Sequence, residues 1–343
     1  MGTDAIRANR IGGMKVAVIG SGGIGGYFGA RLAGAGHDVH FVARGAHLAA
    51  LREHGLTVTG PGGTTTLPRV SASDGTDGTD DTAGAGSTDG AGGSEGGGRT
   101  GPVDLVLLAV KTWQLGAALP LLDPLVGPGT AVLTLQNGVT APEETAAAVG
   151  RAAVLPAVAK IITMLDGPGR IRHVGGAGSL TFGEWDNRDS ERVRRIRDAF
   201  TGAGVPVTVP ADIWAELWAK LLFVVPFGGL GAATGATIGE LRTRPGTRQL
   251  LADGMAEVRL VAEAHGVTLP AGIIEETLAF VDAQPAEGTS SLQRDIAAGR
   301  PSELDAWTGA VAGLAARAGV AAPLHGFLHQ LLALREDRAR AEA

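Results

Sequence analysis

The stretch KVAVIGSGGIGGYFGARLAGAG, residues 15–36, decides the fold class. It opens with a short β-branched run, which is typical of a buried strand. A cluster of glycines follows, and the chain then continues as a helical stretch with small residues along it. The glycines are spaced Gly20-x-Gly22-x-x-Gly25. This order of strand, tight turn and helix predicts the start of a βαβ unit.

Strand and helix signals continue to alternate after this unit. Further strands are expected in HDVHFVAR (37–44), VDLVLLAVK (103–111) and GTAVLTLQNG (129–138), with a helical stretch between the last two. This alternation predicts a Rossmann-type α/β domain with a doubly wound parallel sheet. Residues 152–184 are again strand-rich and precede a charged helix at 188–203. From Ala211 the pattern is nearly all helical, so we expect an α/β domain at 14–208 and an all-α domain at 209–343.

Three segments need separate interpretation. Residues 1–13 lack the apolar core of a signal peptide, and we expect a disordered extension. Residues 71–101 are almost wholly small or polar, so they are expected to form a disordered insertion. Residues 221–239 carry no charge, but eight of these 19 are Gly, Thr or Pro. A buried helix broken near Pro226 is therefore favoured over a membrane span.

The composition excludes several classes of protein. With 343 residues, 44% hydrophobic and 19% charged, the chain can bury a sizeable core. A formal net charge of −6 gives no sign of a nucleic-acid partner. The absence of cysteine excludes a disulfide framework and a thiolate nucleophile, which fits a cytoplasmic protein. His325 and His329 are spaced i, i+4 but lack a third ligand in the pattern, so no metal site is expected.

The glycine motif predicts a dinucleotide site. Its second glycine lets the backbone approach a pyrophosphate, its third lets helix pack on strand, and the helix N-terminus faces the negative charge. The residues expected around the cofactor are Gly20, Gly22, Gly23, Ile24 and Gly25. The next strand ends without an acidic residue for a ribose 2′-hydroxyl and presents Arg44 instead. Arg44 can pair with a 2′-phosphate, so NADP(H) is predicted, with a solvated loop arginine as the alternative.

A single lysine stands out in the helical half. Only four of the 29 Lys and Arg residues are lysines, and one of them, Lys220, stands in AELWAKLLFVVPFGG (215–229) ahead of an apolar run. The simpler interpretation is a surface lysine that snorkels and pairs with Glu216 at i, i+4. The functional interpretation is a proton donor, because burial can tune the pKa of lysine whereas arginine stays charged.

Five motifs in order resemble those of the ketopantoate reductases (2-dehydropantoate 2-reductases). They are the glycine motif with Arg44, VKTWQ at 110–114, LQNGV at 135–139, AELWAKL at 215–221 and SSLQRDIAAGRPSELD at 290–305. The resemblance extends from Met14 to about Leu334, apart from the glycine-rich insertion. It implies NADPH-dependent reduction of a small 2-keto acid, by default 2-dehydropantoate to pantoate in pantothenate biosynthesis. No membrane partner is implied, and the sequence leaves a homodimer open.

The resemblance also implies roles for individual residues. It places Lys111 and Gln114 beside the cofactor, Asn137 near the nicotinamide and substrate, Lys220 as general acid, Ser291 on the substrate carboxylate, and Glu303 on the reacting oxygen or the lysine. The chemistry agrees, because reducing a ketone places negative charge on oxygen that a cationic donor stabilises. Structural alternatives remain: Ser302 and Asp305 could form a capping box, with Glu303 as an ordinary acidic residue of the first helical turn, Ser290 could replace Ser291, and Asn137–Gly138 is an ordinary turn signal.

One departure from the family bears on the substrate. Many members carry asparagines one and two turns after the catalytic lysine, on the substrate side, where this chain has Val224 and Gly228. These two positions are therefore expected to form a wider and less polar substrate wall. The alternatives are a related reductase of another branched 2-keto or imino acid, and an NADP-binding sensor without turnover. Retention of Lys220 and Glu303 argues against the sensor.

Overall fold

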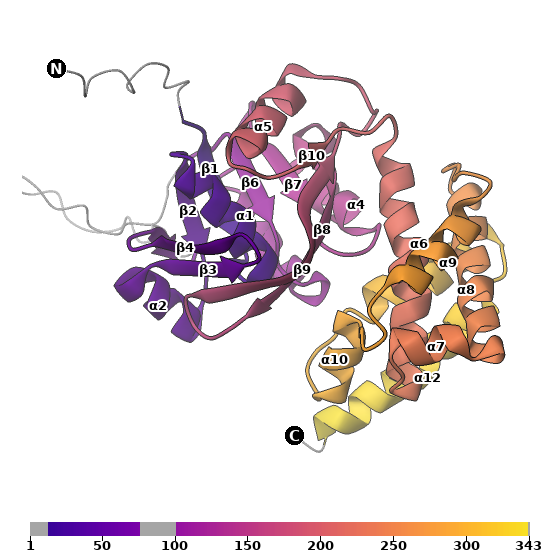
Figure 1. Cartoon of the computed structure of the whole chain (residues 1–343). Coiled ribbons are helices and arrows are strands. Elements are labelled where there is room, and N and C mark those ends of the chain that lie inside the picture. Colours follow the sequence, from indigo (N-terminus) through magenta and orange to yellow (C-terminus); the bar gives the residue numbers. More distant parts are fainter. Residues whose placement is uncertain (1–12, 76–100, 342–343) are drawn as a thin grey trace, which may run out of the picture. The chain divides into compact units, whose positions relative to one another are not determined.

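The computed structural model describes residues 13–75 and 101–341 (Figure 1). Their chain forms two compact units. The first comprises the described parts of Met1–Val110 together with Gly116–Leu135 and Thr145–Pro210, and the second comprises Lys111–Leu115, Gln136–Glu144 and the described part of Ala211–Ala343. The chain passes from the first unit to the second for the last time after Pro210, two residues beyond the domain boundary expected at 208/209. That two short loops of the N-terminal half belong to the helical unit was not anticipated. The extension expected at 1–13 lies outside the described residues except for Gly13.

The first unit is built on a mostly parallel sheet, as the alternating pattern predicted. Among the described residues it has ten strands in the order β4-β3-β9-β8-β7-β6-β1-β2-β5, with β10 paired to β9. The strands are β1 (Lys15–Ile19), β2 (Asp38–Val42), β3 (Leu56–Gly60), β4 (Gly63–Leu67), β5 (Ser71–Ser73), β6 (Leu105–Leu108), β7 (Ala131–Thr134), β8 (Val154–Leu165), β9 (Arg170–Phe182) and β10 (Val207–Thr208). The pairs β3–β4 and β8–β9 are antiparallel. The β3–β4 hairpin was not predicted.

The expectation that the disordered insertion begins at residue 71 is wrong. Ser71–Ser73 forms strand β5, which pairs in parallel with β2, and Ala72 and Ser73 are buried. The ring nitrogens of His40 on β2 lie 2.8 Å and 2.7 Å from the hydroxyl oxygens of Ser71 and Ser73. Small residues can form a strand here because their order comes from backbone pairing and from His40 rather than from apolar side chains. Residues 76–100 of the expected insertion lie outside the described residues.

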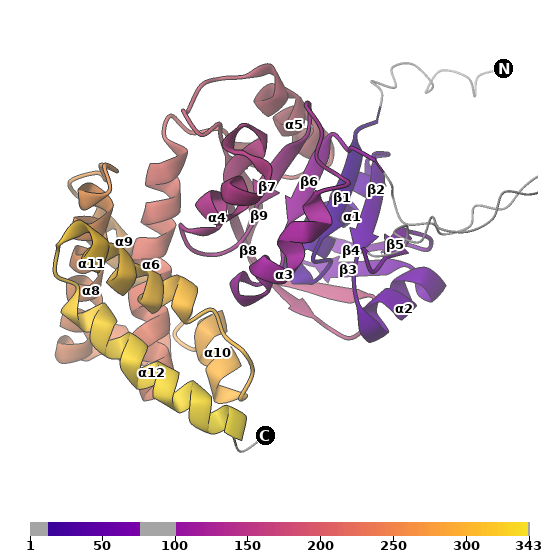
Figure 2. The ribbon, with the colours of Figure 1, turned by 180° about the vertical axis from the view of Figure 1, so that it is seen from behind.

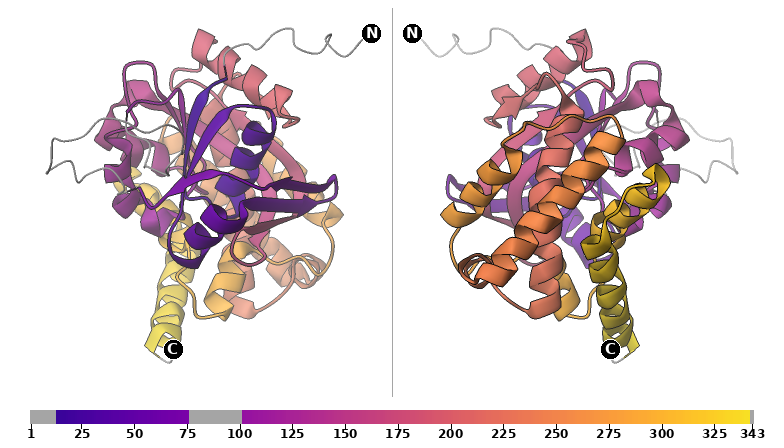
Figure 3. Two further views of the ribbon diagram at one scale, coloured as in Figure 1. Left: turned by 90° about the vertical axis from the view of Figure 1, so that its left-hand side faces the viewer. Right: turned by 90° about the vertical axis from the view of Figure 1, so that its right-hand side faces the viewer.

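The glycine-rich helix α1 packs closely on the sheet (Figure 3). A Cβ atom on Gly25 would overlap the carbonyl oxygen of Gly20, and one on Gly26 would overlap the side chain of Ile171 on β9. The small residues of α1 are therefore required because the backbone of the glycine loop and side chains of the sheet approach the helix closely. The helices up to β10 are α1 (Gly23–Gly34), α2 (Gly45–His54), α3 (Leu115–Ala118), α4 (Ala141–Val149) and α5 (Glu191–Gly202), with 3-10 turns η1 (Thr112–Gln114), η2 (Leu119–Leu122) and η3 (Arg151–Ala153).

The second unit is helical and its central element is α6 (Figure 2). Its helices are α6 (Ile213–Thr234), α7 (Ile238–Thr243), α8 (Pro245–Ala264), α9 (Ile273–Ala283), α10 (Ser291–Ala297), α11 (Ala310–Ala318) and α12 (Pro323–Ala341), with a π-helical turn η4 (Asp305–Gly309). The side chain of Asp212 caps α6 by accepting the backbone N–H groups of Trp214 and Ala215. Gly235, in the left-handed conformation, ends the helix. Helices α8, α10 and α12 pack against α6.

Helix α6 runs through Pro226 without a break, so the expected break was wrong. A proline inside a helix costs about 3 kcal/mol, which tertiary packing must offset. Pro226 is buried, and a Cβ atom on Gly254 of α8 would lie 2.9 Å from the Cβ of Pro226. This glycine lets α8 close directly on the proline. Among the described residues, α6 is the one helix long and apolar enough to cross a membrane, and 67% of its apolar window is buried in the structure.

Candidate active site

The glycine loop between β1 and α1 depends on the absence of side chains at its glycines. Gly20 has φ +91°, and a Cβ atom there would lie 2.6 Å from the backbone nitrogen of Val110. Around Gly22, by contrast, no atom lies within 4 Å of the position a Cβ would take. Gly22 is the N-cap of α1 and contributes no side-chain hydrogen bond, and the first turn has no acidic residue. No side chain of the loop thus caps the N-terminal N–H groups of α1, which has Gly23 and Ile24 in its first turn, and an uncapped helix N-terminus of this kind fits a pyrophosphate. Gly23 is itself closely packed, because a Cβ atom there would lie 2.5 Å from Thr163 Oγ1.

His47 of α2 holds this loop from its carbonyl side, and its role was missed in the sequence. Its Nε2 lies 2.8 Å from the carbonyl oxygen of Ser21, and the backbone N–H of Gly169 donates to its Nδ1 at 3.0 Å. These partners fix the neutral tautomer, because Nε2 must donate to the carbonyl while Nδ1 accepts. The Ser21 hydroxyl donates to the carbonyl of Val42 at 2.9 Å. No local motif marks His47, since its partners come from distant segments.

Arg44 lies beside the glycine loop. The backbone N–H groups of Gly20 and Ser21 both donate to the carbonyl of Val42, two residues before Arg44. Arg44 is the N-cap residue of α2, in an extended conformation, and its side chain is exposed. Within residues 13–75 and 101–341 its guanidinium makes no ion pair. It is therefore available to an anionic ligand at the same edge of the sheet.

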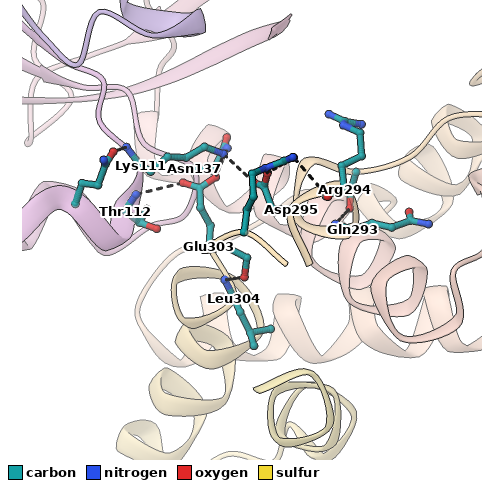
Figure 4. Close-up of polar contacts among 12 residues, drawn as sticks. Lys111, Thr112, Asn137, Gln293, Arg294, Asp295, Glu303 and Leu304 are labelled. Atoms are coloured by element: carbon teal, nitrogen blue, oxygen red, sulfur yellow. Dashed lines mark hydrogen bonds and ion pairs between the residues drawn. The ribbon is translucent and has the colours of Figure 1, made fainter. Parts of the chain in front are cut away.

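Glu303 is the centre of a polar cluster in the second unit (Figure 4). Its side chain is only 4% exposed, so its carboxylate needs partners. Oε2 accepts from Lys111 Nζ at 3.3 Å and from Asn137 Nδ2 at 3.2 Å, and Oε1 accepts from the backbone N–H of Thr112 at 3.4 Å. Glu303 thereby connects the loops after β6 and β7 to the chain segment before α11.

Asn137 connects this cluster to Lys220. Lys220 Nζ, from α6, donates to Asn137 Oδ1 at 2.7 Å. The orientation of the amide follows from chemistry, because an ammonium can only donate and a carboxylate can only accept. Asn137 therefore presents its oxygen to Lys220 and its nitrogen to Glu303. Two residues expected at the site from the sequence, Lys220 and Glu303, are brought together through a third.

Asp295 is a further member of the cluster that the sequence reading missed. It accepts from Lys111 Nζ at 3.4 Å and from Arg300 Nη2 at 2.9 Å. Lys111, with 43% of its side chain exposed, thus contacts two carboxylates, Asp295 and Glu303. Arg300 also contacts Asp295, and Lys220 joins the same cluster through Asn137. The available signal was the position of Asp295 inside the motif SSLQRDIAAGRPSELD.

Other predicted site residues have more local partners. The side-chain oxygen of Gln114 accepts the backbone N–H of Lys111 at 3.3 Å, which fixes the loop that carries the lysine. The Ser290 hydroxyl caps α10 by accepting the backbone N–H of Gln293 at 3.0 Å. The Ser291 hydroxyl makes no hydrogen bond in the described part of the chain. Ser291, rather than Ser290, therefore has a hydroxyl free for a ligand.

The capping box suggested for Ser302 and Asp305 is not formed. Ser302 accepts the backbone N–H of Leu304 at 3.2 Å, but its own backbone N–H donates to Glu336 at 2.9 Å. Asp305 instead lies 2.9 Å from His329 Nε2. His325 contacts a different carboxylate, Glu257, at 2.6 Å. The two histidines of the i, i+4 pair thus have separate carboxylate partners.

The two positions that depart from the family differ from each other. Val224 is half-buried and lies one turn beyond Lys220 on the continuous helix α6. Gly228 is buried, and a Cβ atom on it would lie 2.5 Å from Cζ3 of Trp307. The open space expected at Gly228 is therefore filled by the indole ring. The expectation of extra width at this position is therefore wrong, while the less polar wall stays a prediction.

Comparison with known proteins agrees with these observations. The family models described as "Ketopantoate reductase PanE/ApbA" and "Ketopantoate reductase PanE/ApbA C terminal" match residues 16–187 and 212–336. The chain belongs to the ketopantoate reductase family. A 2-dehydropantoate 2-reductase from Mesorhizobium japonicum is 32% identical over 319 residues, covering 87% of this chain and 90% of the relative. The resemblance inferred from the motifs is confirmed, and the chain is an oxidoreductase that acts on CH–OH groups.

Solved structures support the same assignment. The 2-dehydropantoate 2-reductase from Geobacter metallireducens has a TM-score of 0.81 and 31% identity, covering 94% of this chain and 99% of that one. A D-mandelate dehydrogenase with NADH and anilino(oxo)acetate has a TM-score of 0.80 at 22% identity, covering 95% and 99%, and shows the shared fold. The predicted Rossmann-type sheet followed by a helical domain is thus confirmed.

Proposed function

We propose that this chain reduces a 2-keto acid with NADPH, with 2-dehydropantoate as the default substrate and pantoate as the product. The observation that carries the proposal is the 2.7 Å hydrogen bond from Lys220 Nζ to Asn137, whose amide is in turn oriented by Glu303. Such a chain of contacts holds one ammonium group in a defined position, as proton donation to a developing alkoxide requires.

The proposed chemistry divides between cofactor and protein. Bound NADPH supplies a hydride to the keto carbon. Lys220 donates a proton to the keto oxygen as that oxygen gains the electron pair of the carbonyl bond, and the neutral amine regains a proton from solvent. Asn137 accepts one of the ammonium protons and thereby fixes the position of the group that donates to the substrate. Ser291 and Lys111 hold the substrate carboxylate.

The proposed cofactor site belongs to the first unit. The open backbone at Gly22 and the uncapped N-terminus of α1 fit the pyrophosphate, and the exposed Arg44 fits a 2′-phosphate. NADPH is therefore proposed over NADH. A reductase acting on another branched 2-keto acid is a second candidate, which the apolar side chain of Val224, one turn beyond Lys220, favours.

The test is NADPH oxidation by the purified full chain over a panel of 2-keto acids, repeated with NADH. Turnover that prefers NADPH and is lost in Lys220→Ala, with NADPH binding retained, supports the proposal. Binding of NADPH without turnover of any 2-keto acid would contradict it and favour the sensor. Assays of the same 2-keto acids with added ammonia test whether an imino acid is the substrate.

A further inference from the structure

Glu303 lies in a segment whose backbone is not part of a helix or strand. Residues 300–302 have no regular secondary structure, and Glu303 itself lies in a bend before the π-helical turn η4. Its carboxylate nevertheless contacts Lys111 and Asn137 at defined distances. A side chain on an irregular segment is held less precisely than one on a helix or strand, unless other contacts fix its backbone. For Glu303 those contacts come from α12.

Glu336 of α12 is a buried carboxylate that holds this segment. Its Oε1 accepts the backbone N–H of Ser302 at 2.9 Å, and its Oε2 accepts the Ser302 hydroxyl at 3.3 Å. The hydroxyl oxygen of Ser302 in turn accepts the backbone N–H of Leu304 at 3.2 Å. One carboxylate therefore fixes the residue before Glu303 directly and the residue after it through the serine.

The direction of these hydrogen bonds makes the carboxylate specific. The N–H of Leu304 can only donate, so the Ser302 hydroxyl accepts there and gives its own proton to Glu336. A glutamine at 336 could accept the N–H of Ser302, but its amide nitrogen would then face the hydroxyl, whose proton would lose its acceptor. Because Ser302, Glu303 and Leu304 are all buried, an unpaired group in this segment is costly.

The held segment contacts the turn that contains Asn137 at two points. Glu303 Oε2 accepts from Asn137 Nδ2 at 3.2 Å. Three residues after Glu303, the carbonyl oxygen of Ala306 lies 3.0 Å from the position that a Cβ atom on Gly138 would take. A displacement of the segment would therefore be passed to Asn137, which orients the proposed proton donor.

We propose that Glu336 is a positioning residue of the reductase. By fixing the backbone on both sides of Glu303, it holds Glu303, Asn137 and Lys220 in the arrangement that proton transfer requires. It acts through Ser302 rather than on the reacting atoms. Its loss would displace the donor without removing it, and a displacement of about 1 Å can cost about 10² in rate. This inference rests on the proposed reductase function.

The first measurement is kcat of Glu336→Gln in the full chain, with NADPH and the best 2-keto acid. We expect kcat to fall about tenfold to a hundredfold. The value is normalised to the concentration of NADPH-binding sites, so the folded fraction of the preparation does not enter. An unchanged kcat would overturn the inference.

Glu257→Gln is the matched control for this variant. Glu257 is also a largely buried carboxylate, and it accepts the backbone N–H groups of Leu324 and His325 at the start of the same helix. The control should keep the wild-type kcat. An equal fall in Glu257→Gln would show that attachment of α12 as a whole decides the rate, and would overturn the specific role of Glu336.

The second measurement asks whether Glu336 acts through Glu303. Glu303→Gln is itself expected to lower kcat, and in this background Glu336→Gln should lower kcat further by less than about twofold. Its effect on the melting temperature should be the same in both backgrounds, because the contact with Ser302 remains. A merely structural residue would change the melting temperature without this coupling in kcat. Equal fold-losses of kcat in the two backgrounds would overturn the inference.

Ser302→Ala tests the same link with a smaller change. It removes the hydroxyl between Glu336 and the N–H of Leu304 while keeping the backbone contact with Glu336, so it carries the test if Glu336→Gln does not fold. Its kcat should fall by less than that of Glu336→Gln, and by nothing further in the Glu303→Gln background. Wild-type turnover with an unchanged kcat in Ser302→Ala overturns this inference alone. A wild-type chain that turns over no 2-keto acid overturns the proposed function as well.

Discussion

The glycine loop of the first unit and the polar cluster of the second unit are built in opposite ways. The loop depends on the missing side chains of Gly20, Gly22 and Gly25, and backbone groups supply hydrogen bonds that hold it. The cluster around Glu303 works through side chains, supplied by loops and helices far apart in the sequence. Added atoms should therefore damage the first site, whereas removed charges and donors should damage the second.

The largest expected effect is at Lys220. Lys220→Ala should lower kcat by on the order of 10²–10³ through loss of one preorganised donor, and further through loss of proton transfer. Lys220→Arg should stay poor, because the guanidinium keeps the charge but does not give up a proton. NADPH affinity, measured by titration, should change little in both variants. Near wild-type kcat in Lys220→Ala would show that Lys220 of the side-chain cluster is not the proton donor.

Arg44 is the one side chain expected to bind the cofactor at the glycine loop, where the other expected contacts come from the backbone. Arg44→Ala should weaken NADPH binding about 10–100-fold, which corresponds to the 1.5–3 kcal/mol of a charged hydrogen bond. NADH binding should hardly change, since NADH lacks the 2′-phosphate. The dissociation constants of both cofactors provide the measurement. Equal weakening of the two would show that Arg44 does not read the phosphate.

Gly25 and Gly22 separate packing from ligand space within one loop. Gly25→Ala inserts a methyl group against the carbonyl of Gly20 and the side chain of Ala109, so it should cost about 1–3 kcal/mol of stability. Gly22→Ala adds the same group in open space with φ −71°, so the melting temperature without ligand should stay near wild type. Its NADPH affinity should nevertheless fall. Equal thermal destabilisation by both substitutions would contradict this division.

The same contrast explains what the sequence could predict. The strand, glycine loop and helix of residues 15–36 are a local pattern whose physics is complete within about twenty residues. Lys220 could be singled out because the chain otherwise favours arginine. The contacts of Lys111 with Asp295 and Glu303 span 184 and 192 residues, so no local pattern contains them.

Two errors have the same origin. The helix was expected to break at Pro226 because the local rule is strong, but the close packing of Gly254 on the proline overrides it. Open space was expected beside Gly228 because a glycine has no side chain, yet Trp307 comes from a segment 79 positions later and fills it. In both cases a tertiary neighbour decided what the residue does, and the sequence alone did not identify that neighbour.

The smallest expected effect is at a side-chain cluster of the second unit that serves the scaffold. Glu257 of α8 accepts the backbone N–H groups of Leu324 and His325 at the start of α12, at 2.8 Å and 3.0 Å, and contacts His325 Nδ1 at 2.6 Å. Burial alone would raise the pKa of Glu257, but these hydrogen bonds together hold it below its ordinary value. A lowered folded-state pKa means that the ionised carboxylate stabilises the fold above the unfolded-state pKa, about 4.3, and that this stability is lost as pH falls through the folded value.

Glu257→Gln should therefore cost about 1–2 kcal/mol near pH 7, and its melting temperature should approach that of the wild type below about pH 4. Its kcat should stay at the wild-type value, because Glu257 has no contact with Lys220, Asn137 or Glu303 in the described part of the chain. Melting temperatures at both pH values and kcat at neutral pH provide the measurement. A destabilisation that persists at low pH would show that packing, rather than the charge on Glu257, holds α12 in place.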